Sequence, residues 1–380
     1  MKVASPARFF LPLVALVLLA APAAVVVRAQ DARSALTNFP ESQAVLYINA
    51  RRLINEAAPS VVPADVLNKA LAEAKQFIDL NGLEYVIAGA RLKGDVSAKQ
   101  LPEFLLIVRG NFSADAMLSG ARMMGENMYT QETVGTKTLS VFTFNKPAPA
   151  GGGGEQNNPK KFPIDQIAAV ALDANTVAVG IPAYLRDAIE EGGSRPRLKP
   201  ELVDLALRDA NTLVSLVADI PPGMSQHLRA LGVPPNAEAD SMIDALRQVQ
   251  LAVNMQPSTF GVQSIMRMES SEKAMTLSGL VNMGLGFVKA EITKELQKPN
   301  VSDREDKAAL LRLLDTFTNA SRGSEVELGL TFQQATVAEV MKRQMTPKPK
   351  KQDSALAAPS TPGAKKGAAV KRRRARPRRR

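Results

Sequence analysis

Two periods of hydrophobic residues alternate along the chain and predict strands mixed with helices. Alternating or continuous runs of Val, Ile, Leu and Phe, as in 83–90 and 104–109, are typical of strands. Apolar residues three and four positions apart, as in 113–125, are typical of helices that cover a sheet. Most strands follow one another closely, so we predict an α+β fold with mainly antiparallel sheets and helices packed on one face.

The same patterns give element bounds along the whole chain. The predicted strands are 44–49, 83–90, 104–109, 138–144, 167–172, 176–181, 212–219, 250–255, 259–268 and 325–332. The predicted helices are 65–80, 113–125, 182–189, 241–249, 270–296, 303–319 and 336–343, with Asp65, Ser113 and Ser270 or Ser271 as candidate N-caps.

One unit of strand, strand and helix recurs. Leu118-Ser119-Gly120 and Met124-Gly125 reappear with the same spacing as Leu277-Ser278-Gly279 and Met283-Gly284, each after a strand pair. We therefore predict two related halves, residues 30–197 and 198–344. The alternative is a chance match between two helices rich in Ala, Met and Gly. The second half shows no counterpart of the strands predicted at 138–144 and 167–172.

The run Phe39-Pro40-Glu41-Ser42-Gln43-Ala44-Val45-Leu46-Tyr47-Ile48-Asn49, together with the later repeat, resembles uncharacterised exported bacterial proteins built from two related α+β halves. The resemblance covers about residues 39–343. It implies a location in the cell envelope and supplies no catalytic residue.

The first 29 residues have the pattern of an export signal. Lys2 and Arg8 precede an apolar run from Phe9 to Val27, and Val27-Arg28-Ala29 places small residues where a signal peptidase reads. Cleavage is expected before Gln30, which predicts a periplasmic or secreted protein. The alternative is an uncleaved membrane anchor, because 19 apolar residues can just span a bilayer. Both readings place the rest of the chain outside the cytoplasm.

Charge is distributed unevenly along the chain. Residues 347–380 hold 13 Lys or Arg and one acid, Asp353, so the net charge of +11 comes from this stretch and the body is mildly acidic. We predict a disordered basic tail over 345–380 that contacts anionic polymers or lipid headgroups. Its site residues are Lys371, Arg372, Arg373, Arg374, Arg376, Arg378, Arg379 and Arg380. The alternative is a tail that only raises solubility. A second low-complexity stretch, 146–163, reads as a flexible insertion rich in Gly and Pro.

Candidate chemistry in the body is sparse. The chain has no Cys and one histidine, His227, in a loop that turns into a short helix. A Ser-His-Asp site would need a buried carboxylate and an exposed Ser beside His227, and no Gly-x-Ser-x-Gly motif is present. The many Met residues offer thioethers for Cu(I), but Met more often fills a core that is poor in aromatics. They fall on predicted core faces. We therefore predict no catalytic, cofactor-binding or metal-binding residues.

These patterns together predict a non-enzymatic exported protein of the cell envelope. It would be a binding or scaffold module whose basic tail contacts an anionic polymer or lipid surface. A protein is a further possible partner. One alternative is an envelope hydrolase with a site between the halves that uses carboxylates or a Ser with His227. Another is a nucleic-acid-binding protein that acts through the Arg-rich tail. An exported chain would meet nucleic acid only outside the cell.

Overall fold

The computed structural model describes residues 29–345 apart from 76–78, 93–101, 126–127, 145–163, 191–195, 231–233, 235 and 299–303. The predicted export signal apart from Ala29, the predicted insertion at 146–163 and the predicted basic tail apart from Met345 lie outside the described residues. All eight predicted site residues from Lys371 to Arg380 lie outside them too.

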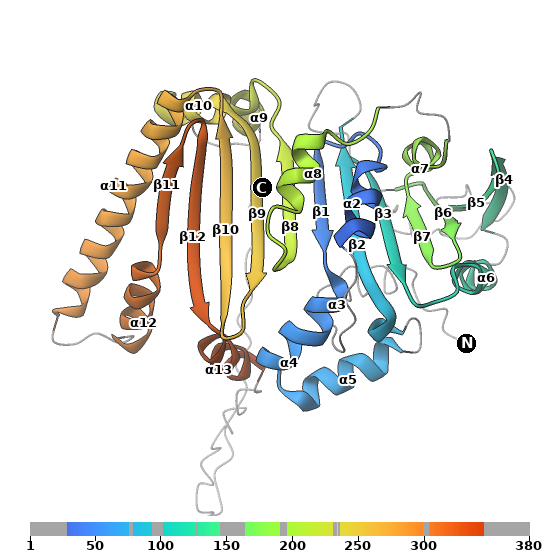
Figure 1. The fold of residues 1–380 in the computed structure, drawn as a ribbon, viewed down its shortest axis with the longest axis horizontal. Helices are drawn as coiled ribbons and strands as arrows, with labels where there is room; N and C mark the ends of the chain where they lie inside the picture. Colours follow the sequence, from blue (N-terminus) through green and yellow to red (C-terminus); the bar gives the residue numbers. More distant parts are fainter. Residues whose placement is uncertain are drawn as a thin grey trace, which may run out of the picture.

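One 12-stranded sheet in the order β11-β12-β10-β9-β8-β1-β2-β3-β7-β6-β5-β4 forms the centre of the molecule (Figure 1). Every neighbouring pair is antiparallel. The strands are β1 Ala44–Ile48, β2 Leu83–Arg91, β3 Glu103–Gly110, β4 Tyr129–Val134, β5 Lys137–Thr143, β6 Gln166–Asp173, β7 Thr176–Gly180, β8 Thr212–Asp219, β9 Leu246–Met255, β10 Thr259–Met268, β11 Thr318–Arg322 and β12 Glu325–Gln333.

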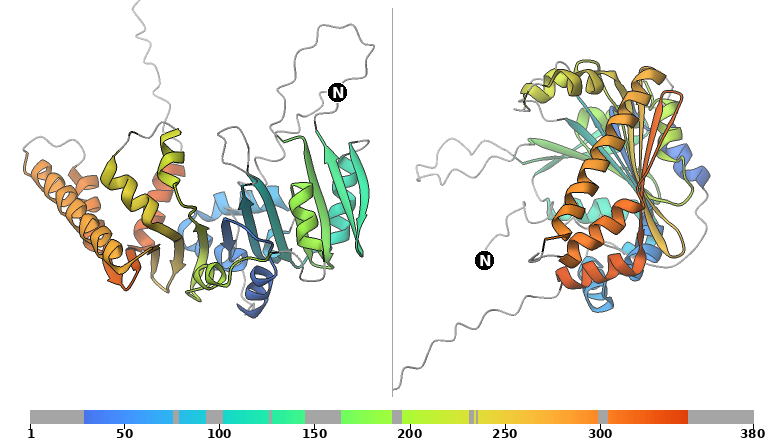
Figure 2. Two further views of the ribbon diagram at one scale, coloured as in Figure 1. Left: turned by 90° about the horizontal axis from the view of Figure 1, so that it is seen from above. Right: turned by 90° about the vertical axis from the view of Figure 1, so that its left-hand side faces the viewer.

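Helices connect the strands and cover parts of both faces of the sheet (Figure 2). They are α2 Ala29–Thr37, α3 Ala50–Arg52, the π-helix η1 Leu53–Ala57, α4 Ala58–Val61, α5 Ala64–Ala74, the 3₁₀ helix η2 Leu80–Gly82, α6 Ala114–Met124, α7 Pro182–Ile189, α8 Pro200–Ala206, α9 Met224–Ala230, α10 Ala237–Ala245, α11 Ser271–Leu296, α12 Arg304–Asp315 and α13 Gln334–Met345. None of these helices is both long and apolar enough to cross a bilayer.

The two faces of the sheet follow from the alternation of side chains along β1. Val45 and Tyr47 point to face A, where they join a core with α2, α7 and α8. Leu46 and Ile48 point to face B, where they pack with α3, η1, α4 and α5. Further along face B, α6 packs on β6 and α11 packs on β10, β11 and β12. The helices thus lie on both faces, and the prediction of helices on one face is wrong.

The α+β class and the mainly antiparallel sheet are confirmed. The structure joins the two predicted sheets into one, because β1 pairs with β8 over five residues from Ala44↔Ala218 to Ile48↔Val214. The strand order outward from this pair is the same on both sides, β1-β2-β3-β7-β6 and β8-β9-β10-β12-β11. The common origin of the two halves stays a prediction.

Several bounds differ from the sequence prediction for local reasons. The helix predicted to start at Asp65 begins at Ala64 after Pro63 and ends at Ala74. The helix predicted at 241–249 ends at Ala245, because β9 starts at Leu246. The helix predicted at 303–319 ends at Asp315, and β11 follows it. The strands β4 and β11 and the helices α2 and α8 were not predicted. Ser113 and Ser270 cap α6 and α11 as expected.

Candidate functional site

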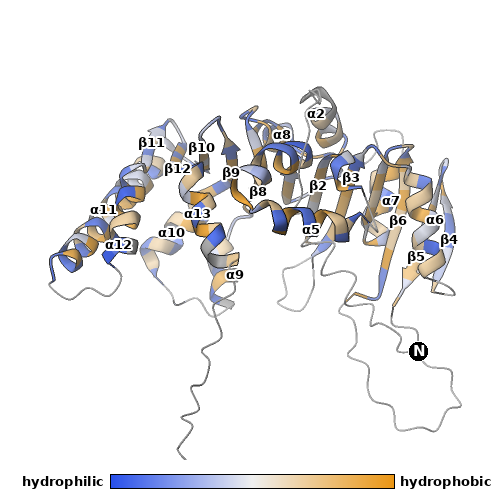
Figure 3. Cartoon of the chain, turned by 90° about the horizontal axis from the view of Figure 1, so that it is seen from below, coloured by the Kyte–Doolittle hydropathy of each residue, from blue (hydrophilic) through white to orange (hydrophobic). Residues whose placement is uncertain are grey.

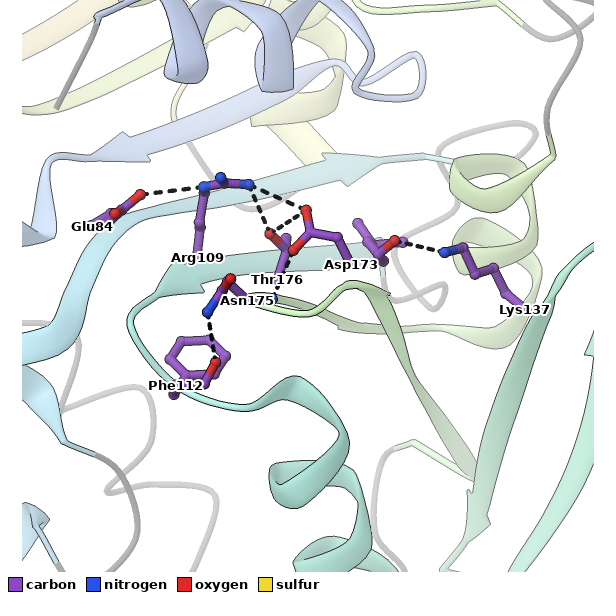
Figure 4. Close-up of polar contacts among 8 residues, drawn as sticks. Glu84, Arg109, Phe112, Lys137, Asp173, Asn175 and Thr176 are labelled. Carbon is purple, nitrogen blue, oxygen red and sulfur yellow. Dashed lines mark hydrogen bonds and ion pairs between the residues drawn. The ribbon is translucent and has the colours of Figure 1, made fainter.

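A cluster around Arg109 connects four neighbouring strands, β2, β3, β7 and β6, at one end of the sheet (Figure 4). The Arg109 Nε donates to Glu84 Oε2 at 3.2 Å, and Nη1 lies 3.2 Å from both Asp173 Oδ2 and Thr176 Oγ1. The Thr176 hydroxyl in turn donates to Asp173 at 2.9 Å. Burial alone would lower the pKa of Arg109, but the nearby Tyr85, Asp173 and Glu84 raise it above its ordinary value.

Arg267 in β10 occupies the corresponding position on the other side of the sheet. One row of paired residues crosses both halves: Leu328, Ser264, Leu251, Leu216, Leu46, Ala88, Leu106 and Val179. Arg109 is three residues beyond this row in β3, and Arg267 is three residues beyond it in β10. The two arginines therefore have equivalent places in the sheet.

The surroundings of Arg267 differ in detail. Its Nε donates to Glu325 Oε1 at 2.8 Å and its Nη1 to Gln248 Oε1 at 3.0 Å. Arg208 donates to the other oxygen of Glu325 at 2.9 Å, so one carboxylate serves two arginines. Burial alone would raise the pKa of Glu325, but the hydrogen bonds from Arg267 and Arg208 lower it overall.

The Arg91–Tyr184 cluster lies at the opposite end of face A, where α7 meets β2 and β3. Arg91 bridges Glu103 at 2.7 Å and Asp187 at 2.6 Å, and its guanidinium carbon stands 4.0 Å from the centre of the Tyr184 ring. The fully buried Tyr184 hydroxyl bonds Ser42 and the Glu41 carbonyl. Burial raises the pKa of Tyr184 to about 12, although Ser42 and Arg91 act in the other direction.

Each of these three clusters joins residues distant in sequence through guanidinium groups that meet carboxylates. Such an arrangement holds strands and a helix in register. None of the three arginines Arg91, Arg109 and Arg267 was predicted from the sequence as part of a site. The available signal was a charged residue near the end of an apolar strand, which does not reveal its partner. Among the described residues, no group of three or more acidic or His side chains is placed to hold a metal ion.

The region of His227 contains a serine paired with a carboxylate. His227 lies in α9, and Ser225 precedes it by two residues. The buried Ser225 hydroxyl donates to Asp244 Oδ2 at 2.7 Å, and its backbone N–H donates to Oδ1 at 3.0 Å. These two hydrogen bonds lower the pKa of Asp244. Ser225 thus ties α9 to the end of α10. Its hydroxyl donates to a carboxylate whose lowered pKa makes it a weak base, whereas a nucleophilic serine needs a base strong enough to take its proton.

The junction between the halves is the β1–β8 strand pair. On face A it lies beneath α8, where Ser215 and Gln250 are buried and the Gln250 amide donates to Ser215 at 3.3 Å. On face B it exposes Leu216 and Leu251. The junction is therefore a continuous sheet with an apolar strip on one face. The hydrolase alternative needs converging polar groups instead.

The Met residues do not follow the predicted core faces. Met268 is buried, but Met123, Met124 and Met128 are exposed, and so are Met275 and Met283 on α11. The prediction that they fill the core is wrong for these five. For the four that lie on α6 and α11, exposure follows from the place of these helices near the two ends of the sheet, where one side of each helix meets solvent (Figures 1 and 3).

Comparison with known proteins adds little to this picture. No family model matches the chain, and no curated protein sequence matches it. The chain is similar to solved structures of TP0453. Crystal form III is 9% identical with a TM-score of 0.37, covering 81% of this chain and 97% of that one. Form IV is 10% identical with a TM-score of 0.39, covering 80% and 95%. TM-scores this low carry no argument about fold or function.

Proposed function

We propose that this is an exported, non-enzymatic binding or scaffold protein of the cell envelope. In this proposal the α+β body is a rigid platform, and the basic stretch 371–380 attaches it to an anionic polymer or lipid surface. The observation that carries the proposal is the separation of charge. Arginines of the body such as Arg91, Arg109 and Arg267 meet carboxylates, whereas 371–380 holds eight cations and no acid.

The physical basis is release of counterions. An anionic polymer such as a glycan sulfate or phosphate chain holds a layer of small cations, and a cluster of Lys and Arg displaces it on binding. Binding of this kind weakens steeply as salt rises. It depends on the number of cations more than on their order, so no shaped pocket in the body is required.

The test compares binding to immobilised heparin and to lipopolysaccharide across a salt gradient. The full chain is compared with a chain that ends at Met345, where α13 ends and the body stays whole. We expect the full chain to elute at clearly higher salt, because only it carries the Arg-rich stretch. Equal retention of both chains would remove the stretch as a tether.

Two control variants separate charge from sequence. Replacing the eight basic residues of 371–380 by Gln should reduce retention most of the way to that of the shortened chain, which also lacks the five lysines between 348 and 366. Shuffling the order of the same ten residues should leave retention unchanged, because counterion release depends on charge density. If the shuffled chain lost binding, a specific motif would be at work. Tighter binding to duplex DNA than to heparin at the same salt would favour the nucleic-acid alternative.

A further inference from the structure

Helix α11 packs at the end of the sheet with only one of its sides. Ala274 is fully buried, and Leu277 packs with it against Val326 of β12. Lys289 and Glu295 form ion pairs with Asp315 and Lys307, which tie α11 to α12. The helix is 26 residues long and lies at the β11 end of the molecule (Figure 1). Figure 3 shows hydrophobic and hydrophilic residues intermixed along it.

The opposite side of α11 is exposed along its whole length. The exposed side chains that lie in one line are Glu272, Thr276, Gly279, Met283, Phe287, Ala290 and Lys294, and we call them the α11 stripe. Phe287 is 70% exposed and Met283 55% exposed. The steps are 4, 3, 4, 4, 3 and 4 residues, which makes two repeats of 11 residues. A period of 11 matches a nearly straight helix, so the stripe stays on one side from end to end.

The positions of the α11 stripe are spaced symmetrically about Met283, at 4, 7 and 11 residues on either side. In an antiparallel pair of such helices centred on Met283, Phe287 of one copy would face Gly279 of the other. Glu272 would face Lys294, and Thr276 would face Ala290. No heavy atom lies within 4 Å of the position that a Gly279 Cβ would take, so that side of the helix has room for a ring. The pattern is therefore self-complementary in shape and in charge, as a two-fold interface requires.

We propose that a second copy of this chain docks on the α11 stripe, with the two helices antiparallel and related by a two-fold axis through Met283. Each Phe287 ring would lie over Gly279 of the other copy. A Glu272–Lys294 ion pair would form at each end of the two helices. Lys294 is available for this role, because its side chain is 71% exposed and lies 3.9 Å from Glu291 of its own helix. Large exposed apolar side chains at an end of a folded domain commonly mark such contacts.

The first test measures self-association of the full chain by sedimentation velocity over a range of concentrations. We expect a monomer–dimer equilibrium. Phe287→Ala should raise the dimer Kd by at least about 30-fold, as loss of a central aromatic anchor does. Gly279→Leu should also raise it by filling the gap, while leaving the isolated fold intact, because the site is open and Leu is a better helix former. Met123→Ala, on the exposed side of α6, should change nothing.

Charge exchange tests the antiparallel register. Glu272→Lys and Lys294→Glu should each raise the dimer Kd, because each places like charges at both ends of the pair. The double variant should restore the wild-type Kd, since the charges again complement each other. Failure of this rescue, with each single variant folded, would overturn the antiparallel arrangement.

The two-fold axis itself can be tested by cross-linking. The chain contains no Cys, so Met283→Cys provides a single thiol that would meet its own copy at the axis. It should form a covalent dimer under mild oxidation, whereas Met123→Cys should not. A wild-type chain that stays monomeric, or dimers unaffected by Gly279→Leu and Phe287→Ala, would overturn the proposal. Binding of a monomeric chain to phosphatidylglycerol vesicles that is lost in Phe287→Ala would also overturn the proposal. It would show that the α11 stripe contacts lipid.

This proposal is independent of the tether, because the α11 stripe contains no residue of 371–380. The chain that ends at Met345 should dimerise with the same Kd as the full chain.

Discussion

Arg109 and Arg267 have the same place in the sheet but hold their neighbourhoods together differently. Arg109 connects Glu84, Asp173 and Thr176 and is the sole arginine in that group of four. Arg267 shares Glu325 with Arg208. The first cluster concentrates its contacts on one cation, whereas the second spreads them over two. An equivalent position in the sheet thus does not imply an equivalent contribution to stability.

The same contrast holds for two glycines in the corresponding strands β7 and β12. Gly180 and Gly329 each follow the central row by one residue. A Cβ at Gly180 would meet the backbone oxygen of Phe104 at 2.5 Å and the Leu105 Cα at 3.0 Å. A Cβ at Gly329 would meet the Thr318 hydroxyl oxygen at 2.5 Å and no backbone atom within 4 Å. The Thr318 side chain can rotate to relieve this contact. The first half is packed more rigidly at this point.

The largest expected difference comes from adding one methyl group at these glycines. Gly180→Ala should lower the free energy of unfolding by about 2–3 kcal/mol, because backbone must move to admit it. Gly329→Ala should cost less than about 1 kcal/mol, since only Thr318 must rotate. The measurement is the urea midpoint at constant m value. Equal losses would show that the two sides of the sheet are equally tight.

Removal of each arginine charge should give the next largest difference. Arg109→Met keeps the apolar stem but leaves Glu84 and Asp173 without their shared cation. We expect a loss of about 1–2 kcal/mol in unfolding free energy, allowing for partial exposure of the pair. Arg267→Met should cost below about 1 kcal/mol, because Arg208 still pairs with Glu325. The comparison uses urea unfolding at low and at high salt. A larger loss of unfolding free energy for Arg267→Met than for Arg109→Met would contradict the expectation that the Arg109 cluster depends more on its single arginine.

The last difference is absent at neutral pH and appears only in alkali. It concerns Tyr47 and its counterpart in β8, Val217. Burial and the neighbouring Tyr85 raise the pKa of Tyr47 from 10.0 to about 12. Below pH 10 this tyrosine is neutral in both the folded and the unfolded chain, so stability is unaffected. Between pH 10 and 12 only the unfolded chain ionises, and stability falls by about 1.4 kcal/mol per pH unit for this group. Tyr47→Phe should reduce the alkaline loss, and Val217→Leu should not. An unchanged slope in Tyr47→Phe would contradict the burial of the hydroxyl.

Strands with strong apolar patterns were predictable from the sequence almost to the residue. The bounds of β8, β10 and α7 agree with the prediction, because both the strand periodicity and the proline at the start of α7 are local signals. The edge strands were not predictable. β11 reads Thr-Asn-Ala-Ser-Arg and β4 reads Tyr-Thr-Gln-Glu-Thr-Val, and both owe their extended form to a neighbouring strand.

The polar clusters also could not be predicted from local sequence patterns, because their members are far apart in the sequence. Arg109 and Asp173 are 64 positions apart, and Arg208 and Glu325 are 117 apart. Only the order of strands in the sheet brings them together. The repeat of Leu-Ser-Gly and Met-Gly did locate α6 and α11, but it did not indicate which side of each helix faces solvent. That depends on what each end of the sheet leaves uncovered.

The central place of β1 sets the order in which the chain can complete its fold. Its partners are β2, which follows soon in the sequence, and β8, which lies beyond residue 211. The face A core also contains Leu202, Val203 and Leu205 of α8. While the chain emerges from the ribosome or crosses a membrane N-terminus first, one edge of β1 stays unpaired until β8 has appeared. The first 190 residues should therefore be held in an unfinished, aggregation-prone state, and a chaperone would act most effectively in that interval.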